Sequence, residues 1–231
     1  MAVRQPLRTD IQPFFEVHEA PYFAPPSLYE QAGKRAFDFV VSLLLLLLFA
    51  PLIVVLMVTV AVTSGFPVFY SGVRMGKDGR TFRIWKLRTM VPDAESLIER
   101  WKQKGTQEGI VYLQSYKLRR DPRVTRLGRI LRKTSLDELP QLWNVLRGDM
   151  SLVGPRPIVE AELEKYGDDA TAFLSVRPGI TGLWQVRGRN DIDYPARADV
   201  ELEYIRRFSW RLDAAVLLRT VPVLLVKRNG R

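Results

Sequence analysis

Residues 39–62 read FVVSLLLLLLFAPLIVVLMVTVAV, an apolar run without a single charged side chain. As an α-helix this run would be about 36 Å long, which exceeds the roughly 30 Å of a bilayer's hydrocarbon core. A buried helix of a small soluble domain seldom stays apolar on every face. A signal peptide would begin nearer the N-terminus and end at a small-residue cleavage site. The run therefore predicts a segment that inserts into a membrane.

Pro51 stands in the middle of this run, directly after Ala50. Proline lacks a backbone N–H and clashes with the preceding turn, so the helix is expected to break or kink here. Basic residues flank the run on both sides: Lys34 and Arg35 precede it, and Arg74, Lys77, Arg80 and Arg83 follow it. Because basic residues favour the cytoplasmic side, a re-entrant hairpin bent at Ala50–Pro51 keeps both clusters there. A straight span would put one cluster outside, so the hairpin is preferred, with a kinked span as the open alternative.

Charge and residue usage narrow the classes of function. The chain of 231 residues carries 35 Lys and Arg against 25 Asp and Glu, a net charge of +10. Such an excess indicates an anionic partner, namely nucleic acid, phospholipid or a phosphorylated substrate. There is no cysteine and His18 is the only histidine, which excludes disulfides and argues against a Ser-His-Asp triad or a histidine zinc site. Nucleic-acid binding explains the charge but not the apolar run, so no nucleic-acid partner is expected.

The whole pattern predicts an α+β fold that is mostly helical and monotopic, with a re-entrant helix–break–helix and interfacial amphipathic helices. Residues 1–30 form an N-terminal leader, residues 31–65 the membrane hairpin, and residues 66–231 a domain on the cytoplasmic side. Alternating apolar and polar residues over 66–90, around the turn GKDGR, predict a β-hairpin. Helical patterns follow, and Asp93 is expected to cap the first of them. They cover residues 93–104, 123–133, 136–147, 196–208 and 210–228.

Residues 135–157, SLDELPQLWNVLRGDMSLVGPRP, place two adjacent acids, Asp137 and Glu138, among apolar and basic residues. The simplest interpretation is structural, because Ser135 followed three residues later by Glu138 is a capping box. Acids in a first helical turn also complement the helix dipole. The same dipole would keep Asp137 ionised, so a capping role and a chemical role are compatible.

Basic clusters that are held by glycine, proline or an apolar anchor surround this pair in the sequence. They read KLRTM (86–90), RLGRILRKTS (126–135), GPRP (154–157) and RPGITGLWQVRGR (177–189). Arginine matches phosphate oxygens in a two-pronged way, and rigid turns fix where it points. Together they predict a pocket for a ligand with two or three phosphates. An ionised aspartate can attack phosphorus and form an acyl phosphate, and Mg²⁺ would offset the repulsion between the two anions.

The segments KLRTM, DPRVTRLGRILRKTSLDELPQLWNVLRGDMSLVGPRP and RPGITGLWQVRGR resemble the bacterial sugar transferase family, the monotopic phosphoglycosyl transferases, over roughly residues 33–228. The resemblance implies an enzyme that transfers a sugar-1-phosphate from a UDP-sugar to undecaprenyl (polyprenyl) phosphate and releases UMP. It implies the first membrane step of glycoconjugate or exopolysaccharide assembly, with membrane lipid as a partner, at the cytoplasmic face of the bacterial inner membrane. It also implies the minimal catalytic form of the family plus a leader, with residues 66–231 as the catalytic domain.

The resemblance assigns roles to individual residues as well. Asp137 matches the nucleophile that takes the phosphosugar, and Glu138 matches its partner, which helps to hold Mg²⁺ or to handle the acceptor's proton. Ala50–Pro51 matches the break in the family's re-entrant helix, where members often have serine before the proline. The phosphate-binding positions that it implies are Arg132, Arg156, Arg189, Lys86 and Arg88.

A second class of function stays open, namely a non-catalytic scaffold anchored in the membrane, whose basic surface binds anionic lipid. Such a scaffold would keep its function when Asp137 is replaced by asparagine. The sequence does not determine which sugar or glycan pathway is served, whether the chain forms a homodimer, or what residues 1–30 do.

Overall fold

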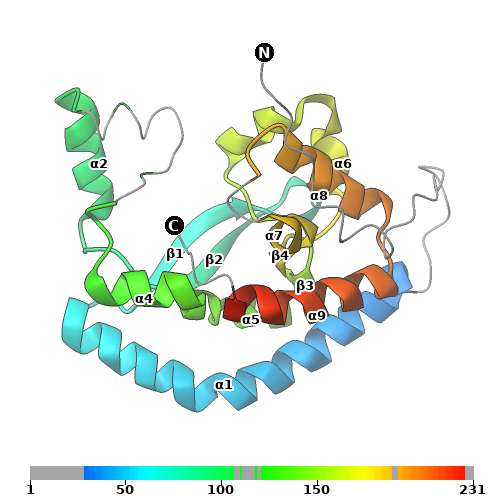
Figure 1. Ribbon diagram of the computed structural model, residues 1–231, viewed down its shortest axis with the longest axis horizontal. Helices are drawn as coiled ribbons and strands as arrows, with labels where there is room; N and C mark the ends of the chain where they lie inside the picture. Colours follow the sequence, from blue (N-terminus) through cyan, green and yellow to red (C-terminus); the bar gives the residue numbers. More distant parts are fainter. Residues whose placement is uncertain (1–28, 107–109, 111–117, 119–120, 189–191, 227–231) are drawn as a thin grey trace.

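The structure is a computed structural model that describes residues 29–106, 110, 118, 121–188 and 192–226. Within these residues the chain is mostly helical and carries two small sheets, as the sequence predicts. A π-helical turn (Tyr29–Gly33) leads into one long helix, α1 (Lys34–Ser64), which runs beneath the rest of the domain (Figure 1). The predicted leader lies outside the described residues except for its last two positions.

The helix α1 is continuous, and Pro51 lies inside it. Figure 1 shows the helix bent, with its two ends rising toward the domain and its convex side facing away. The predicted kink is therefore present, but the predicted break in helical structure at Ala50–Pro51 is not. A proline removes one hydrogen bond from the ladder, and a helix of 31 residues bends at that point without losing its helical conformation.

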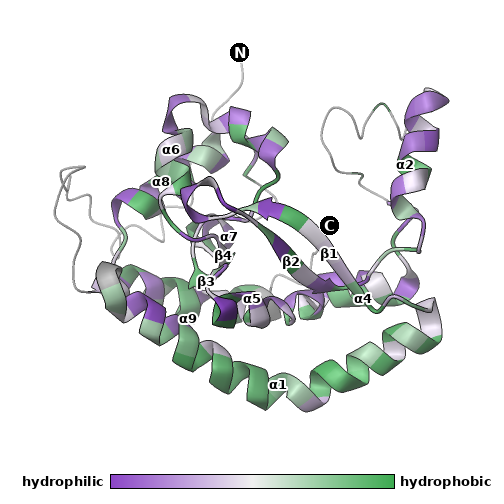
Figure 2. Ribbon diagram, turned by 180° about the vertical axis from the view of Figure 1, so that it is seen from behind, coloured by the Kyte–Doolittle hydropathy of each residue, from purple (hydrophilic) through white to green (hydrophobic). Residues whose placement is uncertain are grey.

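Both ends of α1 pack against the domain, whereas most of its length is exposed. At the N-terminal end, Arg35 donates hydrogen bonds of 2.6 Å to the carbonyls of Val145 and Leu146, and Asp38 accepts one of 3.1 Å from the Leu152 N–H. At the C-terminal end, Val60 is fully buried in a cluster with Val68, Leu87 and Leu131. Between these ends only 6% of the apolar window is buried, and Figure 2 shows hydrophobic residues along nearly the whole helix. An apolar surface of this length indicates membrane association.

The predicted β-hairpin is confirmed. Strand β1 (Phe69–Met75) pairs antiparallel with β2 (Thr81–Leu87), and a 3₁₀ turn (Lys77–Gly79) joins them. Asp78 and Gly79 take positive φ angles of 57° and 74°, which Asp and Gly tolerate well. The outer edge of β2 is covered by Asn144, whose side chain accepts from the Trp85 N–H at 3.0 Å and donates to the Arg83 carbonyl at 2.8 Å.

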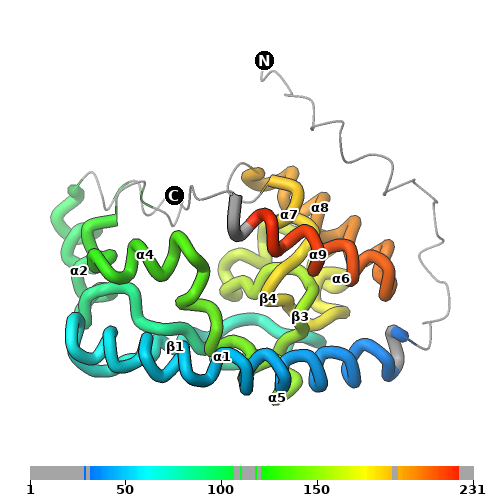
Figure 3. Tube along the Cα trace, turned by 60° about the horizontal axis from the view of Figure 1, so that its bottom comes forward, coloured from blue at the N-terminus to red at the C-terminus, as the bar shows by residue number. Residues whose placement is uncertain are grey.

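The predicted helices are present with shifted ends. They are α2 (Ala94–Gln103), α4 (Arg126–Thr134), α5 (Gln141–Arg147), α8 (Ala196–Arg206) and α9 (Trp210–Val226). Asp93 precedes α2 but its side chain makes no capping hydrogen bond, whereas Thr125 caps α4 through Gly128 N–H. In Figures 1 and 3, α4 lies above the C-terminal half of α1 and α9 above its N-terminal half. Lys34 at the start of α1 pairs with Asp213 of α9 at 2.5 Å.

Sequence reasoning missed a second sheet. Strand β3 (Ser151–Val153) pairs parallel with β4 (Gly179–Thr181). The sequence pattern predicted only a rigid turn at β4 and assigned no element to the residues of β3. Between them come a 3₁₀ segment (Glu160–Asp169) and α6 (Ala170–Leu174), and α7 (Leu183–Arg187) follows β4. The main hydrophobic core lies between this sheet, α1, α5, α8 and α9. Its fully buried members include Val145, Met150, Val153, Leu183, Tyr204 and Val216.

Candidate active site

Asp137 and Glu138 lie on a short 3₁₀ turn (Leu136–Glu138) between α4 and α5. The predicted capping box is wrong, because Ser135 takes a left-handed conformation (φ 58°) and its side chain caps no helix. The helix predicted over 136–147 is accordingly split, and α5 begins only at Gln141, after Pro140. Glu138 points to the hairpin instead, where its Oε1 lies 2.6 Å from Lys86 Nζ. The two carboxylates are therefore not explained as helix caps.

Asp137 is buried, with 7% of its surface exposed. Burial, and then the neighbouring Glu138, raise the pKa of Asp137 to about 6, while Lys86 and Arg132 oppose the rise. Burial is thus the largest influence on this carboxyl, and it opposes the charged form. Asp137 is still mostly ionised at neutral pH, and it is a stronger base than an exposed aspartate. A raised carboxyl pKa beside cationic groups is typical of a reactive site.

Two of the predicted phosphate-binding residues reach this pair from separate elements. Lys86 comes from the end of β2 and pairs with Glu138, whereas Arg132 comes from the last turn of α4. Arg132 Nε donates to Thr89 Oγ1 at 2.8 Å, which fixes its guanidinium beside Asp137. The close approach of α4 depends on Gly128, because a Cβ there would lie 2.0 Å from the Thr89 carbonyl oxygen.

Arg156 joins the site through the crossing of two glycine-rich turns. The Gly154 N–H donates to the Thr181 carbonyl at 2.9 Å, and the Gly179 N–H donates to the Pro155 carbonyl at 2.8 Å. A Cβ on Gly179 would lie 2.1 Å from Gly154 N, so only glycine lets the two backbones touch. The turn GPRP is thus held in place, and Arg156 interacts electrostatically with Glu138. Burial, and then a neighbouring arginine at position 197, lower the pKa of the Arg156 guanidinium.

Two predicted residues stand apart from this group. Arg88 is buried and donates to the carbonyls of Ser64 and Gly65, so it caps the C-terminal end of α1. Among the described residues, no hydrogen bond or ion pair joins Arg88 to Asp137 or Glu138. This contact explains Arg88 structurally, by the free carbonyls that every helix end leaves. Arg189 lies outside the described residues.

Sequence reasoning missed a cluster behind Arg156. Arg197 of α8 is buried, and its guanidinium lies 4.1 Å from the ring centroid of Trp184 and 5.2 Å from that of Tyr194. Glu201, also buried, pairs with Arg197 at 3.3 Å and accepts a 3.1 Å bond from the Arg156 backbone N–H. The signal was weak, because nothing in the sequence shows that these residues meet across α7 and α8.

The acidic pair can contribute to a magnesium site. Among the described residues, no group of three or more Asp, Glu, His or Cys side chains is placed to hold a metal ion. Mg²⁺ often takes only one or two carboxylates, with substrate phosphates and water completing its six oxygens. Asp137 and Glu138 fit that pattern, as two carboxylates whose remaining partners would be phosphate and water oxygens.

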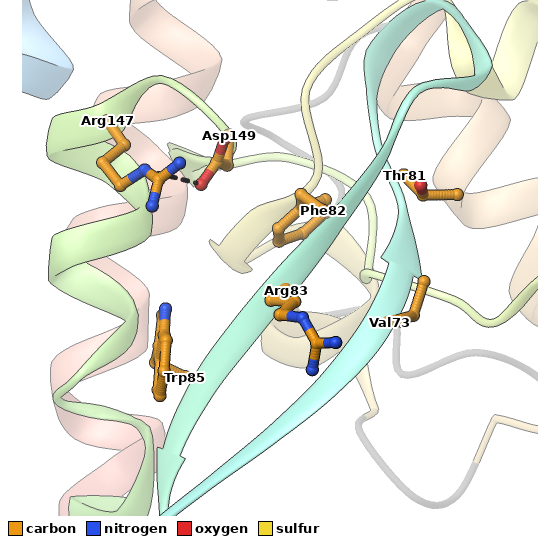
Figure 4. Close-up of a pocket in the computed structure, with 7 residues that line it drawn as sticks. All are labelled: Val73, Thr81, Phe82, Arg83, Trp85, Arg147 and Asp149. Atoms are coloured by element: carbon orange, nitrogen blue, oxygen red, sulfur yellow. Dashed lines mark ion pairs between the residues drawn. The ribbon is translucent and has the colours of Figure 1, made fainter.

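A separate cavity of about 390 Å³ lies between the hairpin and the end of α5 (Figure 4). Arg147 and Asp149, 3.6 Å apart, stand at one end, and Arg83 and Trp85 of β2 line its side. Lys86, Asp137 and Glu138 are not among the residues that line it. This cavity is therefore distinct from the acidic pair.

The chain is similar in sequence to one protein family and to several of its named members. Residues 29–227 match the family model described as bacterial sugar transferase. The chain is 45% identical over 197 residues to a UDP-galactose-lipid carrier transferase of Erwinia amylovora, and 44% identical over 197 residues to an undecaprenyl-phosphate galactose phosphotransferase of Salmonella typhimurium. The matched region covers 85% of this chain but only 41% of the length of each of those two relatives. The chain is also 40% identical over 220 residues to the exopolysaccharide production protein ExoY of Rhizobium meliloti, with 91% of this chain and 96% of that relative covered.

Proposed function

The chain belongs to the bacterial sugar transferase family, and from this premise we propose that it transfers a sugar-1-phosphate from a UDP-sugar to undecaprenyl phosphate. The names of two relatives supply the lipid carrier and the phosphotransfer, and the name of a third supplies exopolysaccharide production as the setting. The observation that carries the proposal is the buried carboxylate of Asp137, held between Glu138, Lys86 and Arg132.

The first step is attack by the Asp137 carboxylate on the β-phosphorus of the UDP-sugar. A bond forms between Asp137 Oδ and phosphorus, the bond from that phosphorus to the bridging oxygen breaks, and UMP leaves with the electron pair. The elevated pKa of about 6 makes Asp137 a better nucleophile than an exposed aspartate while leaving it mostly ionised at pH 7. In the second step a phosphate oxygen of undecaprenyl phosphate attacks the same phosphorus, which releases Asp137 and gives the lipid-linked diphosphosugar.

Cationic side chains of this chain stabilise the anionic donor. Arg132 and Arg156 offer two-pronged donors to the diphosphate, and Lys86 neutralises Glu138 so that the two adjacent acids do not repel it. Glu138 also accepts the acceptor's proton when the lipid phosphate is protonated. When bound, Mg²⁺ would be held by Asp137 and Glu138 and would offset the charge of the phosphates.

The proposed reaction requires a site at the level of the lipid headgroups, where the acceptor's phosphate lies. We propose that α1 is re-entrant, entering and leaving the cytoplasmic leaflet. The support is that one domain packs against both ends, through Arg35 and Asp38 at one and Val60 and Arg88 at the other. A straight span would drive the polar contacts of one end through the bilayer. The exposed apolar convex side faces away from the domain, so it meets the hydrocarbon.

UMP release is the direct test of the activity. Purified protein in nanodiscs that contain undecaprenyl phosphate, with Mg²⁺, is given UDP-galactose, UDP-glucose and UDP-N-acetylglucosamine in turn. We expect UMP from at least one donor, no UMP from Asp137→Asn, and normal release from Asp168→Asn, an exposed acid elsewhere in the chain. Unchanged activity of Asp137→Asn would favour the lipid-binding scaffold instead.

The membrane topology of α1 can be tested by labelling introduced cysteines, because the chain has no native cysteine that would react as well. Cysteine is introduced at Ala36 and, separately, at Lys77, both of which are exposed. In sealed inverted vesicles an impermeant maleimide should label both variants, and in spheroplasts it should label neither. Labelling from opposite sides would make α1 a kinked span.

A further inference from the structure

A chain of alternating cations and aromatic rings leads from the surface to Arg156. Lys165 Nζ lies 4.5 Å from the ring centroid of Tyr194, and the Arg197 guanidinium lies 5.2 Å from Tyr194 and 4.1 Å from Trp184. The Arg156 guanidinium lies 6.0 Å from the same Trp184 ring. Each distance is within the roughly 6 Å over which a cation is attracted to an aromatic face. We call these five residues the cation–aromatic chain.

Within the cation–aromatic chain, the two arginines differ in how their guanidinium groups are used. Glu201 is the acid that contacts both arginines: its Oε1 accepts from the Arg156 backbone N–H and pairs with Arg197 Nη2. Tyr166 donates to the other oxygen of Glu201 and so fixes the carboxylate. Arg156, in contrast, makes no side-chain hydrogen bond to any residue that the structure describes, and Trp184 is the ring that its guanidinium approaches. Glu162 and Glu138 act on Arg156 only through longer-range attraction, so its N–H groups stay available to an anionic ligand.

We propose that Trp184, held by Arg197, is a positioning residue that aims the Arg156 guanidinium at the diphosphate of the nucleotide donor. The inference rests on the proposed function for its choice of ligand. The ring gives Arg156 an attractive surface without occupying its N–H groups, so all five donors stay available for phosphate oxygens. The positive charge of Arg197 repels Arg156, while the carboxylates of Glu162 and Glu138 attract it. Together with the Trp184 ring, these forces hold the guanidinium within reach of Glu138.

The test measures binding of UDP, in the presence of Mg²⁺, by calorimetry on the full chain in nanodiscs. Replacing Trp184 by leucine removes the aromatic face, and a cation–π contact of about 1–2 kcal/mol converts to a roughly 5- to 30-fold rise in the Kd for UDP. Trp184→Phe keeps the face and should bind UDP within about threefold of wild type. Phe82→Leu is the matched control, because Phe82 packs against the same hydrophobic core as Trp184 but belongs to the hairpin.

A double-mutant cycle separates positioning from general loss of structure. If Trp184 acts through Arg156, Trp184→Leu should weaken UDP binding no further in an Arg156→Gln background. Equal weakening in both backgrounds, or a Phe82→Leu variant that loses as much affinity as Trp184→Leu, would overturn the inference. Wild type that releases UMP while Trp184→Leu binds UDP normally would refute only this inference. Wild type that neither binds UDP nor releases UMP would refute the proposed function as well.

Discussion

Replacing Asp137 by asparagine should stabilise the protein while it removes activity. Burial and Glu138 raise the pKa of this carboxyl from 3.8 to about 6, so the folded chain disfavours the charged form. A rise of about 2 pKa units corresponds to about 3 kcal/mol of destabilisation at neutral pH. Asparagine carries no charge and does not incur that penalty. For a chain of this size, about 3 kcal/mol corresponds to a rise in Tm of roughly 6–12 °C.

The pH dependence of that difference gives the stricter test. The penalty is present in full above pH 6, shrinks as pH falls through the folded pKa of about 6, and is gone below the unfolded value of 3.8. We therefore expect Asp137→Asn to melt higher than wild type at pH 8, and the gap to close toward pH 4. Intrinsic tryptophan fluorescence in nanodiscs follows the unfolding, with Asp168→Asn as the exposed control. A gap that is absent at pH 8, or that widens as the pH falls, would refute the assignment of a penalised carboxylate to this position.

Three further predictions concern the pH dependence of the rate, the charge of Lys86 and the crossing of the two glycine-rich turns. The rate of UMP release should fall about tenfold from pH 7 to pH 5 as Asp137 is protonated, and a rate that is flat over this range would exclude it as the ionised nucleophile. Lys86→Met removes a charge that lowers the pKa of Asp137, so the acidic limb of the pH–rate profile should move to higher pH, and an unmoved limb would separate Lys86 from the nucleophile. Gly179→Ala should destabilise the protein by about 1–3 kcal/mol, because the new Cβ would lie 2.1 Å from Gly154 N where the two turns cross. The same variant should have a higher KM for the donor. Normal thermal stability of this variant would show that the two turns have room to separate.

The sequence predicts the elements of this fold better than it predicts their junctions. The apolar run, the hairpin around GKDGR and the helices over residues 94–103 and 196–206 carry clear local periodicity, and each is present. The effect of Pro51 was overestimated, since a long apolar helix bends there without losing its continuity. The short parallel pair of β3 and β4 was missed because three-residue strands carry no periodic signal, and their pairing depends on glycines far apart in the chain.

The site shows the same division. Motif reasoning found Asp137, Glu138, Lys86, Arg132 and Arg156 because they lie in dense local patterns, and the structure brings these five together. It grouped Arg88 with the phosphate-binding residues, although the partners of Arg88 are backbone carbonyls at the end of α1. The helix dipole that it invoked for Asp137 does not predict the burial that raises the pKa of this carboxyl most. Arg197 and Tyr194 were not predicted, because stacking between side chains of different segments produces no recognisable pattern in either segment alone.

A covalent step at Asp137 is measured most directly by mass spectrometry of the intact wild-type protein and of its peptides. The protein is first mixed with a UDP-sugar and Mg²⁺ in nanodiscs without lipid acceptor. We expect an added mass of one phosphosugar on the peptide that contains Asp137, together with one UMP per adduct. Addition of undecaprenyl phosphate should remove the adduct. Steady turnover with acceptor present, but no adduct at any time and no UMP before acceptor is added, would contradict a covalent step at Asp137.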